Sequence, residues 1–321
     1  MNSDQIHDED AALVRRALFL TGPTASGKSA VGIALAKRLN AELISLDSMA
    51  LYRGMDIGTA KPSVAEQAEV PHHLLDVLDI WEAATVAFYR ARALEAARAI
   101  EARGRVPLFV GGTALYLKAM LRGLFDGPAS DEGLRAELEA IANREGGAAL
   151  HDRLREIDPR AAARLHPNDI RRVVRALEVA RLTNKPISDW QLEHAQPAQG
   201  VCVIALARDR DDLQSRIDSR IDHMFSCGFI EEVRRLRDAG RPMHRNPSQA
   251  VGYREVLSML EGAVSLDEAL AAIRARTKRF AKHQETWFRN LAEVQRLEVG
   301  PQETVEAIAD RFTDASHHAR N

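Results

Sequence analysis

The sequence predicts an α/β fold in which a parallel sheet forms the core and an all-helical domain is inserted into it. In the first third of the 321-residue chain, short apolar runs alternate with amphipathic helical patterns, as is typical of a parallel sheet. Between residues 126 and 199 the chain has helical patterns but no convincing strand. An apolar run at residues 201–206 then restores strand character and returns the chain to the sheet.

Each predicted element follows from a local pattern. An amphipathic stretch over residues 85–103 ends before Gly104, which occupies the position of a helix C-cap. The core strands are the apolar runs at residues 17–21, 42–46, 106–110 and 201–206. After the last of them every pattern is helical, so we expect helices over residues 210–227, 229–239, 249–260 and 266–297.

The inserted domain carries its own start and stop signals. Asp131 suits a helix N-terminus, Gly146 a stop, and Asp169 a cap for a helix over residues 170–182. The start of the chain is acidic and its end is weakly patterned. We therefore expect a flexible acidic tail over residues 1–14, the core over 15–125 and 200–300, the helical insertion over 126–199, and a weakly ordered tail over 301–321.

Composition narrows the class of protein. Forty-four basic and 46 acidic residues give a net charge of −2, so no global charge indicates a nucleic-acid partner. Cys202 and Cys227 are far apart, which argues against a disulfide framework or a zinc finger. No apolar stretch is long enough to span a membrane and no leader pattern is present. We expect a cytoplasmic monomer with no membrane partner.

The most informative segment follows the first strand and predicts a phosphate site. Lys28 is placed to contact the outer phosphates, and the hydroxyl of Ser29 to hold Mg²⁺. The loop predicts a P-loop NTPase-like core that grips a diphosphate or a triphosphate such as ATP. The segment fits the pattern G-x-x-x-x-G-K-[ST] with Gly22, Pro23, Thr24, Ala25, Ser26, Gly27, Lys28 and Ser29.

Asp47 is the predicted general base. It ends the second strand, and ligands of open parallel sheets bind outside the carboxyl ends of the strands. Its carboxylate could take a proton from an acceptor group while the loop holds the phosphates. Two other interpretations stay open: Asp47 could ligate Mg²⁺ or cap the following turn.

Further candidates come from the third strand and from one helix. Thr113 follows Gly111-Gly112 and either faces the same cleft or caps the next helix. Arg216 and Arg220 lie four residues apart and share a helix face, which would suit a departing diphosphate. Salt bridges to nearby aspartates are the alternative interpretation.

Two basic clusters suggest a polyanion track in a chain whose overall charge is nearly balanced. Solvated helix faces are the competing interpretation. The clusters consist of Arg171, Arg172 and Arg175 in the insertion, and of Arg274, Arg276, Lys278, Arg279, Lys282 and Arg289 on the last long helix.

Several longer motifs resemble those of the tRNA dimethylallyltransferases. The longest reads DSMALYRGMDIGTAKP over residues 47–62. The others are PHHLLD at 71–76, the stretch 111–116, HPND at 166–169 and VGYR at 251–254, in the family's order. Together with the phosphate loop they cover most of the chain, from about residue 18 to about residue 291.

The resemblance implies transfer of the dimethylallyl group of dimethylallyl diphosphate to N6 of the adenosine just after the tRNA anticodon. It implies that Asp47 is the base, that Thr113 lines the channel, and that Lys28, Ser29 with Mg²⁺, and Arg220 hold the diphosphate. The insertion would clamp the anticodon stem-loop. The implied tRNA contacts are Asp47, Ser48, Met49, Ala50, Thr113, Arg135, Arg171, Arg172, Val173, Val174, Arg175, Gln249, Ala250, Val251, Gly252, Tyr253 and Arg254.

Two positions depart from the family's usual pattern, and two other functions stay open. Ala50 stands where many members have Gln, and a Gln often precedes the arginine at the place of Arg171, so base contacts there are in question. One alternative is a P-loop small-molecule kinase in which Asp47 activates a hydroxyl. The other is an NTP-controlled RNA-binding module without transfer activity.

Overall fold

The computed structural model describes residues 3–123, 127–128, 131–193 and 196–320, which fall into two compact units. The core unit comprises Met1–Leu121 and Pro197–Asn321, and the helical unit comprises Arg122–Gln196. The sequence placed the insertion at residues 126–199, within four residues of these bounds at each end. Residues 126, 129–130 and 194–195 of that expected insertion, and residues 124–125 of the expected core, lie outside the described residues.

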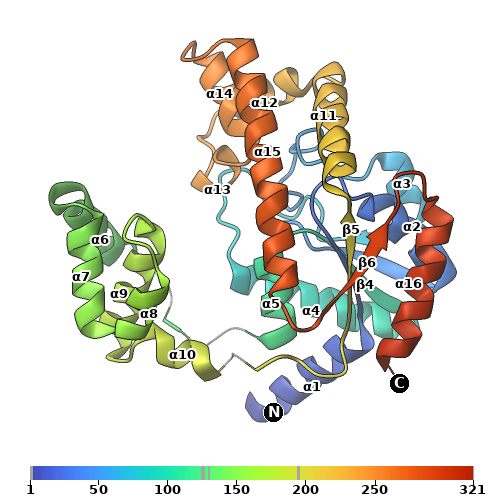
Figure 1. Cartoon of the computed structure of the whole chain (residues 1–321), viewed down its shortest axis with the longest axis horizontal. Coiled ribbons are helices and arrows are strands. Elements are labelled where there is room, and N and C mark those ends of the chain that lie inside the picture. The colour runs from blue at the N-terminus through green and yellow to red at the C-terminus, as the bar shows by residue number, and fades with distance from the viewer. Residues whose placement is uncertain (1–2, 124–126, 129–130, 194–195, 321) are drawn as a thin grey trace. The chain divides into compact units, whose positions relative to one another are not determined.

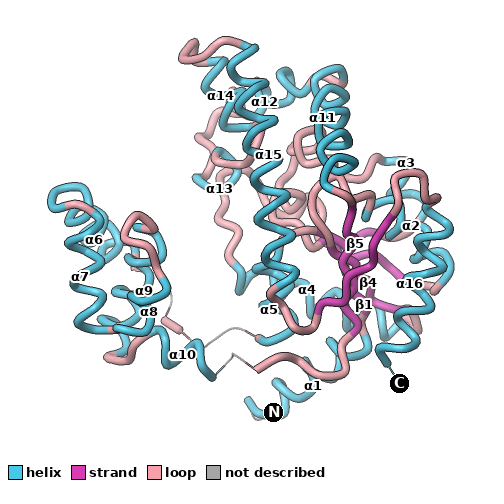
Figure 2. The backbone as a smooth tube through the Cα atoms, viewed as in Figure 1, coloured by secondary structure: helices cyan, strands magenta, loops and turns pink. Residues whose placement is uncertain are grey.

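The core unit is built on a six-stranded parallel sheet, drawn in magenta in Figure 2. β1 pairs with both β4 and β5, so that Thr21 lies opposite Gly111 on one side and Ala205 on the other. The carboxyl ends of these strands therefore reach the same edge. In spatial order the strands are β3 (His72–His73), β2 (Ala41–Ser45), β4 (Val106–Gly111), β1 (Leu18–Thr21), β5 (Cys202–Arg208) and β6 (Val294–Val299).

Alternate strand residues enter two separate hydrophobic cores, one on each face of the sheet. Phe19 lies in the first core, with α4 (Val86–Ala102) and α5 (Ala114–Arg122), while Leu20 lies in the second, with α2 (Lys28–Arg38) and α16 (Val305–Arg320). Ile44 and Leu43 divide in the same way. Because both faces are covered, the strands read as continuous apolar runs.

Further helices complete the core unit around the carboxyl edge and the start of the chain (Figure 1). Their bounds are Ser3–Arg16 for α1, Val64–Glu69 for α3, Arg210–Ser226 for α11, Phe229–Arg237 for α12, Arg245–Ser248 for α13, Tyr253–Leu260 for α14 and Leu266–Arg289 for α15.

The helical unit has a core of its own. Asp131 caps the first helix by accepting the amide of Leu134, as expected, whereas Asp169 makes no side-chain cap. Leu138, Leu154 and Val173 are buried together. The helices are α6 (Glu132–Glu145), α7 (Gly147–Ile157), α8 (Pro159–Arg164), α9 (Ile170–Thr183) and α10 (Ile187–Glu193).

Both chain ends differ from the expectation of loosely ordered tails. α1 buries Leu13 and Val14, and α16 buries Ile308 and Phe312 against the sheet. The predictions of a flexible tail over residues 1–14 and a weakly ordered tail over 301–321 are therefore wrong for residues 8–14 and 305–317. Each helix is amphipathic: its exposed face is charged and its other face is apolar. The charged residues dominate the composition of both ends, so the apolar face was not recognised.

Strands were also missed at both edges of the sheet. A helix was expected to run to residue 297, but α15 ends at Arg289 and β6 follows. β6 exposes Gln295, Arg296 and Glu298, so its apolar signal is weak. β3 has only two residues, too few for periodicity to be seen. No helix in the described ranges is long and apolar enough to cross a membrane.

Replacing Phe312 with alanine tests whether α16 belongs to the folded core. Phe312 is fully buried, so Phe312→Ala should lower the free energy of unfolding by about 3–5 kcal/mol, measured by urea denaturation. Glu306→Ala, on the exposed face of the same helix, is the matched control and should cost less than about 0.5 kcal/mol. Equal stability of the two variants would contradict the packing.

Candidate active site

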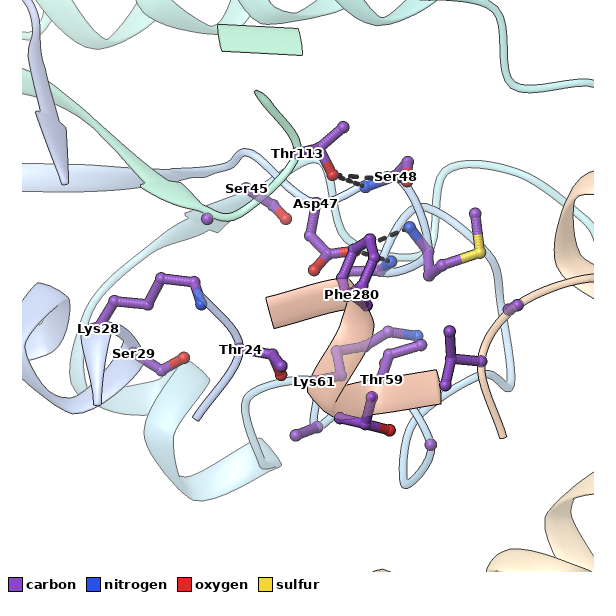
Figure 3. A pocket seen from close by; sticks show the side chains of 18 of the residues that line it. Thr24, Lys28, Ser29, Ser45, Asp47, Ser48, Thr59, Lys61, Thr113 and Phe280 are labelled. Atoms are coloured by element: carbon purple, nitrogen blue, oxygen red, sulfur yellow. Dashed lines mark hydrogen bonds between the residues drawn. The ribbon is translucent and has the colours of Figure 1, made fainter. Parts of the chain in front are cut away.

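A cavity of about 450 Å³ opens at the carboxyl ends of β1, β2 and β4. The phosphate loop forms one wall, and residues 47–50, which follow β2, form another. Figure 3 shows Lys28, at the start of α2, and Asp47, in the segment after β2, reaching toward this space. Phe280 of α15 also lines it. The chain also contributes Gly58–Pro62, Thr113, Arg220 and Gln249–Val251 to its lining. The site residues predicted from the sequence thus form part of the cavity wall, whereas Gly58–Pro62 were not selected as site residues.

The phosphate loop curls tightly and is held from outside. Gly27 has φ 93°, which L-residues with a side chain rarely adopt, and α2 begins at the next residue. Arg208 donates to the carbonyl of Ser26 at 2.8 Å, and Arg216 to that of Ala25 at 3.1 Å. Arg216 therefore supports the loop and does not line the cavity with Arg220. The hydroxyl of Ser26 is buried and has no hydrogen-bond partner among the described residues.

Lys28 folds back on its own loop. Its Nζ donates to the carbonyl of Pro23 at 3.0 Å. Burial, together with the nearby cation of Arg220, lowers the pKa of Lys28 to about 8, and Asp47 opposes both effects. Burial likewise lowers the pKa of Arg220. Two desolvated cations in one cavity favour an anionic ligand.

Asp47 makes a turn with one carboxylate oxygen and leaves the other available. Oδ1 accepts the amide of Met49 at 2.8 Å and that of Ala50 at 3.4 Å, so the turn-capping interpretation is correct for this atom. Within the described chain, no hydrogen bond involves Oδ2. The carboxylate lines the cavity, so capping and proton transfer are compatible roles.

Thr113 faces the cavity and does not cap a helix with its side chain. Its Oγ1 accepts the amide of Ser48 at 3.0 Å, as drawn in Figure 3, and so ties the turn after Asp47 to the end of β4. Gly111 permits this approach, because a Cβ there would lie 2.3 Å from the carbonyl oxygen of Leu46. The sequence suggested the glycines for close approach, and the structure shows which strand they approach.

Two side chains of α15 complete the site and were not selected from the sequence. Gln284, 7% exposed, accepts the amide of Thr24 at 2.9 Å and donates to the carbonyl of Gly112 at 2.8 Å. It therefore links the phosphate loop to the end of β4. Phe280 is 44% exposed on the cavity wall. Phe280 could have been identified as a site residue from the sequence, because it is an aromatic residue in a basic helix. No sequence signal pointed to Gln284.

The residues predicted to contact tRNA through the helical unit differ in their surroundings. Arg135 and Arg175 both bind the fully buried carboxylate of Glu178, which explains the lowered pKa of Glu178 despite its burial. Val173 and Val174 lie in the hydrophobic core. Val173 is 0% exposed and Val174 3%, so their side chains are not available to RNA, and that part of the prediction is wrong.

Arg171 and Arg172 remain on the outside of the helical unit. Arg172 forms an exposed salt bridge with Asp169 at 3.2 Å. Arg171 is exposed, and within the described chain it has no hydrogen bond or ion pair. These two arginines are the accessible part of the predicted cluster.

The segment from Gln249 to Arg254 enters the core unit beside the cavity. Tyr253 is 1% exposed and lines the cavity, and Gly252 has φ 94° at the start of α14. Arg254 is exposed and lies 3.4 Å from Glu255. Of the predicted tRNA contacts here, Gln249, Ala250, Val251 and Tyr253 therefore face the cavity and Arg254 faces solvent.

Half of the basic cluster on α15 is neutralised. Arg274 and Lys278 pair with Asp218, and Arg276 pairs with Glu255. The remaining cations face a second cavity of about 420 Å³ between α11 and α15, together with Arg210 and Arg296. The remaining members are Arg279, Lys282 and Arg289.

The side chains of the cavity can be compared with the ligands that Mg²⁺ requires. Among the described residues no three His, Cys, Asp or Glu side chains gather as a metal site. Mg²⁺ in phosphate sites needs only one or two protein oxygens, the rest coming from phosphates and water. Ser29, whose hydroxyl lines the cavity, meets that need, so the residues present fit a phosphate-bound Mg²⁺.

Sequence comparisons agree with this architecture. Residues 50–291 match the family described as IPP transferase. A tRNA dimethylallyltransferase of Geobacter sulfurreducens is 46% identical over 298 residues, which cover 92% of this chain and 96% of that protein. Another, from Pelotomaculum thermopropionicum, is 44% identical over 297 residues, covering 92% and 94% respectively.

Solved structures agree as well. A tRNA isopentenylpyrophosphate transferase from Bacillus halodurans has a TM-score of 0.69 at 40% identity, covering 95% of this chain and 98% of that one. A eukaryotic dimethylallyltransferase acting on tRNA has a TM-score of 0.73 at 26% identity, covering 94% and 77%. The expected P-loop NTPase-like core is therefore confirmed.

A parallel sheet in which a phosphate loop follows the central strand β1, and a carboxylate that lines the same cavity follows β2, defines an enzyme of the P-loop class. Within that class the chain belongs to the IPP transferase family, and it is a transferase.

The lowered pKa of Lys28 predicts how diphosphate binding depends on pH. Lys28 in the empty site carries its charge below about pH 8, and above that pH it must regain a proton when an anion binds. We therefore expect the wild type to bind magnesium diphosphate more tightly than Lys28→Met at neutral pH. Above the pKa of Lys28, the ratio of the two affinities should fall by up to about tenfold per pH unit. Calorimetry on both proteins at each pH measures it, since the ratio cancels titration of the ligand.

Lys37→Met provides the control, because Lys37 lies on the same helix with an exposed salt bridge to Glu69. Its affinity should follow the wild type at every pH. A ratio between wild type and Lys28→Met that stays constant from about pH 7 to about pH 9.5 would contradict the assignment.

Proposed function

We propose that this protein transfers the dimethylallyl group of dimethylallyl diphosphate to N6 of the adenosine immediately after the anticodon of tRNA, releasing diphosphate. One observation carries the proposal: phosphate-loop residues, the carboxylate of Asp47 and several apolar side chains line a single cavity. The apolar part, which suits a five-carbon chain, includes Met49, Ile221, Met224, Val251 and Ile273. The relatives that act on tRNA in the same family support the choice of acceptor.

The proposed reaction needs no covalent enzyme intermediate. N6 of adenine attacks the allylic carbon, the carbon–oxygen bond to the diphosphate breaks, and its electron pair leaves with the diphosphate. Asp47 accepts the proton that N6 loses. Lys28 and Arg220 stabilise the negative charge that develops on the departing diphosphate. Mg²⁺, held through Ser29 and phosphate oxygens, would neutralise further charge on that group.

Geometry accounts for the need to extrude the adenosine from its stack. The cavity is bounded by strands and by α15, so only an everted base can bring N6 to Asp47. A nucleotide in a loop loses less stacking on eversion than one in a duplex. We also propose that the protein acts as a monomer.

The two alternative functions predict other outcomes. A small-molecule kinase would transfer phosphate from ATP without RNA, and an NTP-controlled RNA-binding module would show no transfer at all. The family match favours prenyl transfer over both. The site itself adds that β4 ends in glycines, with no acidic residue in the position that motor NTPases use for their second Mg²⁺ ligand.

A direct assay tests the proposal. Protein, Mg²⁺, dimethylallyl diphosphate and an anticodon stem-loop should yield RNA heavier by one isopentenyl group, with no product from a stem-loop carrying guanosine after the anticodon. Asp47→Asn should lower kcat by roughly 10²-fold with RNA binding retained, because Asn keeps the Oδ1 turn and loses the base. Absence of mass gain with wild-type protein would refute the proposed reaction.

Salt dependence tests the proposed role of the helical unit. Neutralising Arg171 should reduce the slope of log affinity against log salt by about 0.7–0.9, as expected for one lost phosphate contact. Fluorescence anisotropy of a labelled stem-loop measures the slope, and Arg181→Gln, in which an exposed arginine of the same helix is removed, is the control. Equal slopes for Arg171→Gln and wild type would mean that Arg171 is only solvated.

A further inference from the structure

Glu232 is a buried acidic residue without an assigned role. It lies on α12 and is 1% exposed. Its carboxylate accepts four hydrogen bonds: Oε2 from the amides of Asp56 at 3.0 Å and Ile57 at 2.7 Å, and Oε1 from the amide of Gly58 at 3.2 Å and the phenol of Tyr253 at 2.6 Å. Three successive amides converging on one carboxylate form an anchor for that stretch of backbone.

The anchored backbone is a wall of the cavity. Gly58 and Tyr253 both line it, as do the next residues of the loop. The loop packs so closely on the helices that a Cβ at Gly58 would lie 2.4 Å from Phe229 and 2.5 Å from Tyr253. The position of this wall is therefore set by packing as well as by the four hydrogen bonds.

The loop continues directly to the diphosphate-binding arginine. The carbonyl of Thr59, the residue after Gly58, accepts from Nη2 of Arg220 at 3.2 Å. The far end of the loop is fixed too, because the buried ammonium of Lys61 binds Asp56, Asp76 and the carbonyl of Tyr52. The Thr59 carbonyl is thus held between two anchors, of which Glu232 is the one that binds backbone amides.

We propose that Glu232 is a positioning residue: it holds residues 56–58 so that the carbonyl of Thr59 aims the guanidinium of Arg220 at the diphosphate. The inference rests on the proposed function for the identity of the ligand. It explains why a carboxylate is buried here, where an apolar side chain of similar size would cost less to desolvate. Only a charged acceptor of two oxygens satisfies four donors at once.

Glutamine at this position is the informative substitution. Gln has nearly the same shape, but its NH₂ group cannot accept hydrogen bonds, so at least one backbone amide of the loop loses its acceptor. The loop then leaves its position and Arg220 loses the carbonyl that aims it. Glu232→Gln should bind inorganic diphosphate with Mg²⁺ about tenfold more weakly than the wild type, in the absence of RNA.

Calorimetric titration with magnesium diphosphate is the experiment, on the full-length chain. Asp10→Asn is the matched control: Asp10 is a buried carboxylate in the same unit, bound by Arg90 and Arg98 away from the cavity. Both variants should lower the melting temperature, but only Glu232→Gln should weaken diphosphate binding. A purely structural role would give two variants with wild-type affinity, and that result would overturn the inference.

A double-mutant cycle tests whether Glu232 acts through Arg220. In an Arg220→Gln background, Glu232→Gln should cause little further loss of diphosphate affinity, because the guanidinium that it positions is absent. A further tenfold loss in that background would overturn the inference. Should Glu232→Gln fail to fold, Tyr253→Phe removes one of the four donors alone and should weaken diphosphate binding about twofold to fivefold; unchanged affinity would overturn the inference.

The same titration separates this inference from the proposed function. Wild-type protein that does not bind diphosphate would refute the diphosphate site and the inference together. Wild-type protein that binds it, with Glu232→Gln binding equally well, would refute only the positioning role.

Discussion

The site depends on the close approach of three strand ends at Gly111. The carbonyl of Gly111 accepts the hydroxyl of Thr21 at 2.8 Å, and the absence of a side chain lets the backbone of Leu46 lie against it. β1, β2 and β4 therefore end together, and the segments that follow them open into one cavity. A bulkier residue would separate the phosphate loop from Asp47, and the ammonium of Lys28 and the carboxylate of Asp47 would no longer line one cavity.

Electrostatics then determines what this cavity accepts. The whole chain carries a net charge of −2, but Lys28 and Arg220 share a desolvated space in which Arg220 disfavours the charge of Lys28, with Asp47 as the opposing anion. A bound anion would relieve that repulsion. The positive charge of the cavity is thus local and could not be read from overall composition.

The sequence predicted those features that are encoded in consecutive residues. The phosphate loop, Asp47 and Thr113 each follow a strand, so their edge of the sheet could be inferred. Gln284 and Glu232 could not, because each reaches a partner more than 170 residues away in the chain. The wrong predictions came from ignoring helical periodicity. Val173 and Val174 face the core of the helical unit, and the helices at both chain ends have apolar stripes that pack on the core unit.

The hydrogen bond between Lys28 and the carbonyl of Pro23 ties the ammonium to the turn of its own loop. Any ligand that takes up this ammonium must exchange one oxygen acceptor for another, so the net gain from the new hydrogen bond is smaller than its strength alone. The loop carbonyl is therefore a competitor, built into the chain itself, that limits how tightly this cation can hold an anion.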